Sequence, residues 1–206
     1  MDIIQPDYWP LAIEQLTQAD ATMADLIMRH PAGCLQSRGD AFTTLARAIT
    51  GQQISVKAAD TVWRRLLNLT EITPLAIVAQ STECLRGCGY SQRKVEYLYD
   101  LAKHFSAGLI DPQAWPGMDD SSIINTLTQI RGIGQWSAEM FLMFNLLRPD
   151  VLPLDDIGLQ KAIALHYPGT QQSKPGLREY AERWRPWRSV ATWYLWRSLD
   201  PVVVAY

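Results

Sequence analysis

The stretch from Ile123 to Ile163 constrains the fold more than any other part of the chain. It holds a short run with apolar residues at helical spacing, then Arg131-Gly132-Ile133-Gly134, then a second apolar helical run from about Trp136 to Leu147. Two glycines separated by one apolar residue permit a tight turn with positive φ. The helix after such a turn begins with backbone amides that lack partners within the helix. The pattern therefore predicts two helices joined by a hairpin that can bind a phosphate group.

A glycine pair before a helix also occurs in dinucleotide-binding turns, so the surrounding sequence decides between the two interpretations. A dinucleotide-binding turn needs a preceding strand, a third glycine and an acidic residue on the next strand. The segment before Gly132 has helical spacing without β-branched alternation, and no third glycine follows Gly134 at the required spacing. The chain is therefore not predicted to bind a dinucleotide here.

Two adjacent acidic residues, Asp155 and Asp156, follow the apolar, proline-containing segment Leu152-Pro153-Leu154. A helix is expected to begin near Ile157, and a carboxylate directly before a helix caps its first backbone amides. One of the two acids is therefore expected to cap this helix, and the other is left for chemistry.

The composition sets bounds on size, location and partners. A chain of 206 residues with 48% hydrophobic content can form one sizeable core, or two small lobes that share a cleft. No apolar run reaches the roughly 18 to 20 residues of a membrane helix, and the first residues lack a signal-peptide pattern, so we expect a cytoplasmic protein without membrane contact. We also expect a monomer. A net charge of −2 and a pI near 5.9 argue against binding nucleic acid by bulk charge, but local contact through amides and a few arginines remains possible.

The three cysteines, Cys34, Cys84 and Cys88, are too few and too irregularly spaced for an iron-sulfur cluster or a structural zinc site. We therefore expect reduced thiols and no iron-sulfur cluster.

Three features, in order and at matching spacing, resemble the helix-hairpin-helix (HhH-GPD) DNA glycosylase superfamily, in particular its 3-methyladenine DNA glycosylase II branch. They are the sequence Gly132-Ile133-Gly134-Gln135-Trp136, the spacing from it to Asp156, and the segment from Ala181 to Ser189. The resemblance implies an all-α fold of two helical lobes with a DNA-binding cleft between them. One lobe would span residues 38–149 and carry the motif at about 123–147. The other would combine residues 1–37 with 150–206 and carry the catalytic aspartate.

The resemblance also implies a function in base excision repair. Such an enzyme flips an alkylated purine, 3-methyladenine or 7-methylguanine, out of duplex DNA and hydrolyses its N-glycosidic bond. Asp156 matches the catalytic aspartate of the family, so Asp155 is expected to cap the helix. Trp136, Met140 and Trp196 match the positions that line the base pocket, where electron-rich rings attract cationic bases by cation–π interaction. No cofactor is implied for catalysis.

Further residues match the family's contacts with DNA. The backbone of Gly132, Ile133 and Gly134 matches the phosphate-binding hairpin, and Gln53 matches the residue that fills the gap left by the flipped base. From the residues alone, an alternative is that Gln52 and Gln53 cap and solvate the start of a helix.

The resemblance implies a bound monovalent cation, Na⁺ or K⁺. The backbone carbonyls of Thr128, Ile130 and Ile133 would hold it together with a DNA phosphate. Carbonyl ligation leaves no side-chain pattern, so the sequence carries no independent signal for it.

A long helix is expected from about Ser91 to Ala107. Its charged residues Arg93, Lys94, Glu96 and Asp100 are interpreted as a solvated face rather than as DNA contacts.

Lyase relatives place a lysine at the start of the second hairpin helix, where its amine forms a Schiff base. Here that position is Trp136, and Lys161 lies beyond Asp156, so hydrolysis without strand cleavage is expected. Two other functions stay open. One is a non-catalytic helix-hairpin-helix module that binds DNA, which would have no need of Asp156 or Trp196. The other is a glycosylase for deaminated or oxidised purines, which differs only in its pocket.

Overall fold

A computed structural model describes residues 6–37 and 39–199 of the chain. These residues form twelve α-helices and two 3₁₀ helices, and none of them lies in a strand. The predicted all-α fold is confirmed. Within the same residues, every helix is too short or too polar to cross a membrane.

The chain divides into two compact units. The first unit combines Met1–Ser37 with Leu142–Tyr206, and the second comprises Arg38–Phe141. The chain returns to the first unit at 141/142, inside helix α9, whereas the sequence predicts this crossing at 149/150. The earlier crossing has a physical reason, because Phe144 at the end of α9 stacks on Trp196 of the first unit. Arg38, where the first crossing is predicted, lies outside the described residues.

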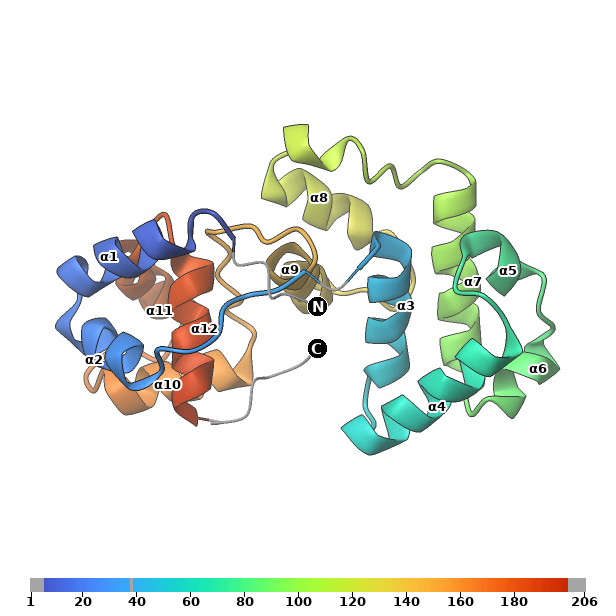
Figure 1. The fold of residues 1–206 in the computed structure, drawn as a ribbon, viewed down its shortest axis with the longest axis horizontal. Helices are drawn as coiled ribbons and strands as arrows, with labels where there is room; N and C mark the ends of the chain where they lie inside the picture. The colour runs from blue at the N-terminus through green and yellow to red at the C-terminus, as the bar shows by residue number, and fades with distance from the viewer. Residues whose placement is uncertain (1–5, 38, 200–206) are drawn as a thin grey trace. The chain divides into compact units, whose positions relative to one another are not determined.

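The first unit is built around one buried helix. Its helices are α1 (Trp9–Ala19), α2 (Ala21–Arg29), α10 (Ile157–His166), α11 (Lys174–Ala181), η2 (Glu182–Trp184) and α12 (Arg188–Leu199). Helix α12 packs against α1, α2 and α10 (Figure 1). All of its residues from Ser189 to Trp196 are buried, so α12 lacks the one-sided pattern of a surface helix.

A buried carboxylate connects three parts of this unit. Asp20 caps α2 by accepting the Met23 N–H at 3.0 Å through Oδ1. Its Oδ2 accepts the Tyr167 hydroxyl and the Trp184 indole N–H, each at 3.0 Å. Burial, and next to it the negative charge of Asp20, raise the pKa of Tyr167 well above its usual range. The tyrosine therefore remains a hydrogen-bond donor to Asp20.

The second unit is built around α7 (Gln92–Ser106). Its other elements are α3 (Ala41–Gly51), α4 (Val56–Leu69), α5 (Pro74–Val78), α6 (Thr82–Gly87), η1 (Trp115–Gly117), α8 (Asp120–Leu127) and most of α9 (Gln135–Phe144). Helix α7 packs against α3, α5 and α6 (Figure 1).

The two hairpin helices, α8 and α9, end earlier than their apolar spacing predicts, which would continue the first to Ile130 and the second to Leu147. Helix α8 ends at Leu127, and the Ile130 N–H bonds the Leu127 carbonyl in a tight turn at 3.1 Å. Helix α9 ends at Phe144 rather than Leu147, which adopts a left-handed φ of 53°. Ile130 is buried and Leu147 is half-buried, although both lie outside the helices. Their burial explains why the apolar spacing continues past the two helix ends.

Candidate functional site

Asp156 is the N-cap of α10. Its backbone is extended (φ −76°, ψ 116°), and its Oδ1 accepts the Leu159 N–H at 2.6 Å. The side chain is buried, with only 6% of the residue exposed. The prediction that Asp155 caps this helix is therefore wrong. The helix begins at Ile157, and the cap geometry belongs to the residue directly before it.

Asp155 lies at the surface and forms an ion pair with Lys174 at the start of α11. Both side chains are about half exposed, at 46% and 58%. An exposed pair of this kind contributes little to stability, because water screens it.

The indole of Trp196 is hydrogen-bonded to the Asp156 carboxylate. The Trp196 Nε1–H donates to Asp156 Oδ1 at 2.7 Å, so the same oxygen accepts both the indole and the Leu159 amide. The Trp196 ring is stacked on Phe144, with centroids 6.0 Å apart and planes at 12°. Trp196, predicted to line the base pocket, thus lies against the predicted catalytic acid.

Gly158 completes this arrangement, since a Cβ at this position would lie 3.0 Å from Asp156 Oδ1. It would also lie 3.2 and 3.3 Å from the Cδ1 and Nε1 atoms of Trp196. The φ of Gly158 is not in the left-handed region, so the absence of a side chain is required by space rather than by backbone conformation.

The segment that leads to Asp156 is attached to the start of α12. The Arg188 guanidinium donates two parallel bonds to the Asp150 carboxylate, from Nε to Oδ1 at 2.7 Å and from Nη2 to Oδ2 at 2.9 Å. Only 12% of the Arg188 side chain is exposed. Two parallel bonds between a guanidinium and a carboxylate fix both groups in orientation.

Ser189 and Gln160 hold the same segment at two further points. The Ser189 hydroxyl accepts the Val151 N–H at 2.9 Å and donates to the Arg148 carbonyl at 2.7 Å. Gln160 Nε2 donates to the Leu154 carbonyl at 2.7 Å. Ser189 belongs to the motif from Ala181 to Ser189, but its hydrogen bonds could not be predicted from sequence because its partners are distant in the chain.

The other two predicted pocket residues lie on α9 in the second unit. Trp136 is half-buried, and Met140 is 6% exposed. They are one helical turn apart, so their side chains share a face. Their role in a base pocket stays a prediction.

The hairpin turn depends on one of its two glycines. Gly132 has a φ of 86°, and a Cβ there would lie 2.2 Å from the Tyr97 ring of α7. Gly134 is not among the residues with positive φ, and no atom lies within 4 Å of a Cβ built there. The predicted positive-φ turn is therefore confirmed at Gly132 alone.

The charged face of α7 does more than contact solvent. Asp100 Oδ2 accepts the Arg131 backbone N–H at 2.8 Å, and Glu96 Oε2 accepts the Arg131 Nη2–H at 3.0 Å. Lys94 Nζ donates to the Thr50 carbonyl at 2.8 Å, and burial lowers the pKa of this lysine. The interpretation as a solvated face is therefore wrong for Lys94, Glu96 and Asp100, which support the end of α3 and the hairpin, whereas Arg93 is exposed as expected.

The two glutamines after α3 do not cap a helix with their side chains. Ser55 caps α4 through its hydroxyl, which accepts the Ala58 N–H at 3.3 Å. Gln53 is exposed and adopts a left-handed φ of 58°. Gln52 instead donates its side-chain Nε2–H to the Gly132 carbonyl at 2.8 Å. Neither glutamine side chain therefore caps α4, although the exposure of Gln53 agrees with a solvated side chain.

The predicted cation ligands Thr128, Ile130 and Ile133 lie in the turn between α8 and α9, outside both helices. The Ile133 N–H bonds the Ile130 carbonyl at 3.1 Å, which draws this turn together. Uncharged carbonyl oxygens in irregular backbone suit Na⁺ or K⁺. Among the described residues, no cluster of three His, Cys, Asp or Glu side chains forms a metal site.

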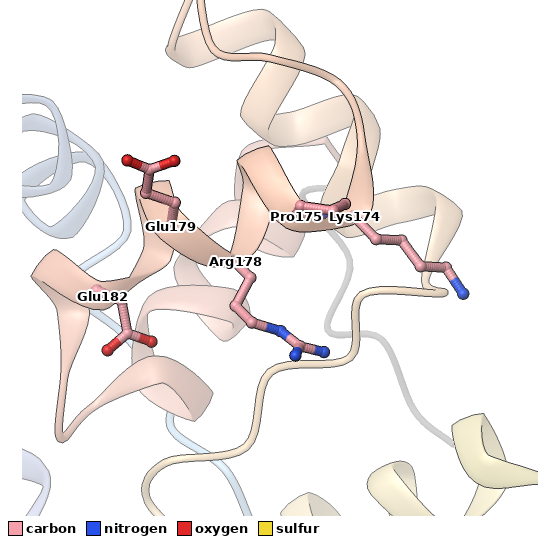
Figure 2. Close-up of a pocket in the computed structure, with 5 residues that line it drawn as sticks. All are labelled: Lys174, Pro175, Arg178, Glu179 and Glu182. Atoms are coloured by element: carbon pink, nitrogen blue, oxygen red, sulfur yellow. The ribbon is translucent and has the colours of Figure 1, made fainter.

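A surface pocket lies over α11 and η2 in the first unit (Figure 2). Its lining residues carry charges of both signs; they are Lys174, Pro175, Arg178, Glu179 and Glu182. Neither Asp156 nor Trp196 lines it, so we assign no chemistry to this pocket.

Comparison with known proteins identifies the family. Residues 46–187 match the family model described as "HhH-GPD superfamily base excision DNA repair protein". DNA-3-methyladenine glycosylase 1 of Schizosaccharomyces pombe is 34% identical over 163 residues, which cover 76% of this chain and 72% of that protein. DNA-3-methyladenine glycosylase 2 of Escherichia coli is 32% identical over 176 residues, covering 80% of this chain but only 58% of that protein.

The solved structures agree with this assignment. The crystal structure of DNA-3-methyladenine glycosidase from Bacillus halodurans matches with a TM-score of 0.85 and 32% identity, covering 97% of this chain and 93% of that one. The S. pombe 3-methyladenine DNA glycosylase Mag1, in complex with abasic DNA, matches with a TM-score of 0.79 and 28% identity, covering 95% and 99%. The chain therefore belongs to the HhH-GPD superfamily of base excision DNA repair proteins, as its motifs predict.

Proposed function

We propose that this protein is a DNA glycosylase that hydrolyses the N-glycosidic bond of alkylated purines such as 3-methyladenine in duplex DNA. The observation that carries the proposal is the buried carboxylate of Asp156, fixed at one oxygen by a backbone amide and an indole N–H. The substrate class is supported by the names of the relatives, several of which are 3-methyladenine glycosylases.

Cleavage of an N-glycosidic bond develops positive charge on the deoxyribose. A carboxylate beside the anomeric carbon stabilises that charge, and it does so more strongly where water is excluded. Because Asp156 is held in orientation before the substrate arrives, little reorganisation is needed as the bond breaks. Water then adds to the sugar, and the products are a free base and an abasic site.

The base must leave the stack before its sugar reaches a carboxylate, at a cost of a few kcal/mol that is smallest for damaged pairs. We assign the DNA contacts to the hairpin backbone at Gly132, Ile133 and Gly134, and the filling of the gap to Gln53. Backbone amides bind phosphate without a basic surface, which is consistent with the net charge of −2. A Na⁺ or K⁺ ion held by the turn carbonyls would add positive charge beside that phosphate.

We assign Trp136 and Met140 to the base pocket. A half-buried indole offers a ring face to a cationic base, with an attraction of about 0.5 to 2 kcal/mol. Trp196 contributes chiefly through Asp156, since its N–H is bonded to that carboxylate and its ring is stacked on Phe144.

The proposal includes hydrolysis without lyase activity, action as a monomer and a cytoplasmic location. Trp136 occupies the position of the lyase lysine, and Lys161 is exposed on α10. Without an amine at the anomeric carbon, the strand stays intact.

The proposal is tested by incubating the protein with methylated duplex DNA and identifying the released bases by chromatography. Matched duplexes with hypoxanthine or 8-oxoguanine serve as comparison substrates. Preferred release of 3-methyladenine or 7-methylguanine supports the proposal. Preferred release of hypoxanthine or 8-oxoguanine would assign a different pocket, and binding without release of any base would favour a non-catalytic module.

A further inference from the structure

Two loops of the second unit are attached to α7 and to Tyr90 just before it. The end of α3 is held by Lys94, whose Nζ donates to the Thr50 carbonyl, and by Tyr90, whose hydroxyl lies 2.7 Å from the Thr50 hydroxyl. The hairpin is held by Asp100, which accepts the Arg131 N–H, and by the Tyr97 ring against Gly132. Both loops are therefore anchored to α7, through Lys94 and Asp100.

The loop after α3 has an unusual tip. Gln53 adopts a left-handed φ of 58° although it is not a glycine, and the next residue, Ile54, is 41% exposed. Val56, at the start of α4, is 74% exposed. Left-handed backbone at a non-glycine residue is strained and persists where the surroundings impose it. A strained turn that presents apolar side chains to solvent is suited to contact with a partner rather than to packing.

One hydrogen bond connects this tip to the hairpin. Gln52 precedes the strained residue, and its side-chain Nε2 donates to the Gly132 carbonyl at 2.8 Å. This bond spans 80 positions of the sequence and joins the two loops without passing through α7. It closes a ring of contacts from α7 through α3 and Gln52 to Gly132 and back to α7.

We propose that Gln52 is a positioning residue that couples the hairpin's grip on the DNA backbone to the insertion of the Gln53–Ile54 tip where a base has left the stack. The inference rests on the proposed function. A hairpin bound to phosphate and a tip inserted between bases must keep a fixed separation, and the bond from Gln52 supplies it. Removing the bond lets the tip move while both loops keep their own attachments to α7.

The variant Gln52→Met keeps the length of the side chain and adds no charge, but removes the donor. A neutral hydrogen bond contributes about 0.5 to 1.5 kcal/mol, which corresponds to about a 2- to 13-fold change in rate. We expect a loss in this range in single-turnover release of 7-methylguanine paired with cytosine. We expect less than a twofold loss when the same base lies opposite an abasic-site analogue, because no base pair then opposes extrusion. Affinity for undamaged duplex should change by less than twofold.

The matched control is Gln80→Met. Gln80 is also half-buried in the second unit and donates its Nε2–H to a backbone carbonyl, that of Ala76 at 3.4 Å, but within one local segment. Gln80→Met should leave both rates unchanged. In the double variant with Gln53→Ala, Gln52→Met should cause no further loss, since it acts through the tip that Gln53→Ala already removes.

Equal losses on paired and unpaired lesions, or additive losses in the double variant, would overturn the proposal and leave Gln52 a structural contact. A separate measurement distinguishes failure of the proposed function. If the wild-type protein releases no 7-methylguanine, 2-aminopurine fluorescence beside an abasic-site analogue still reports insertion of the tip. A smaller fluorescence change in Gln52→Met than in wild type would then support the coupling, and equal changes would reject it.

Discussion

The indole N–H of Trp196 is bonded to the Asp156 carboxylate at 2.7 Å, on the same oxygen that caps α10. The sequence assigns Trp196 to the base pocket, as a ring that attracts a cationic base. The structure gives the tryptophan a second task, which is to hold the carboxylate of Asp156, the group to which we assign stabilisation of the charge on the sugar. The two tasks predict different effects of substitution.

Replacing Trp196 with Phe keeps an aromatic ring and removes the donor. A hydrogen bond to a charged group contributes about 1.5 to 3 kcal/mol, so we expect excision to slow by about 13- to 160-fold. Because the defect acts through Asp156, it should be equal for cationic 7-methylguanine and neutral hypoxanthine in single-turnover assays. A loss of excision for the cationic base alone would contradict this prediction and would show that Trp196 acts only in base recognition.

A substitution at Gly158 tests whether the orientation of the Asp156 carboxylate matters for excision. In Gly158→Ala the new Cβ must displace the Asp156 oxygen or the Trp196 ring, each within 3.3 Å. We expect a loss of excision of about tenfold, with a stability cost of about 1 to 3 kcal/mol for the overpacking. Gly87→Ala in α6 is the control, because nothing lies within 4 Å of its Cβ. Unchanged excision in Gly158→Ala would mean that the orientation of the carboxylate is not critical.

Alanine substitutions at the two hairpin glycines, Gly132 and Gly134, are expected to differ in their effect on stability. Gly132→Ala combines a left-handed φ with a clash against Tyr97, so we expect it to lower the free energy of unfolding by about 2 kcal/mol or more and to weaken DNA binding. Gly134→Ala should leave the unfolding free energy within about 0.5 kcal/mol, as for an ordinary surface change. Urea unfolding of both variants measures the difference. Similar stability losses would show that the turn is not held by Tyr97.

The absence of lyase activity is tested by borohydride reduction during turnover, which traps a Schiff base covalently. We expect no trapped protein–DNA adduct, because the family resemblance puts Trp136 at the position of the reactive lysine. An adduct at the level of a known lyase would contradict this, and its disappearance in Lys161→Ala would identify the amine.

The sequence predicts those parts of the site that depend on local pattern. Gly132 is visible because a tight turn between two apolar helices needs a glycine. Asp156 is visible through its place after an apolar segment and its match to the family. The sequence prediction that Asp155 caps α10 is wrong. The first residue of a helix is uncertain by about one position from sequence, and a shift of one residue exchanges the roles of Asp155 and Asp156.

The supports of the site are not visible in the sequence, because they join distant segments. Gln52 bonds the hairpin across 80 positions, and Arg188 bonds Asp150 across 38. Charged residues on a helix such as α7 are usually solvated, so Asp100 gives no local sign that it binds the Arg131 backbone. Only the folded chain identifies these partners.

The central claim is that the carboxylate charge of Asp156 drives base release. Asp156→Asn keeps an oxygen that can accept the Leu159 and Trp196 N–H groups and removes only the charge. In single-turnover release of 3-methyladenine from methylated duplex DNA, we expect Asp156→Asn to lose at least about 10²-fold in rate while DNA affinity is retained. Asp155→Asn, which only breaks an exposed pair with Lys174, should act like wild type. Wild-type turnover in Asp156→Asn, or an equal loss in Asp155→Asn alone, would contradict the account.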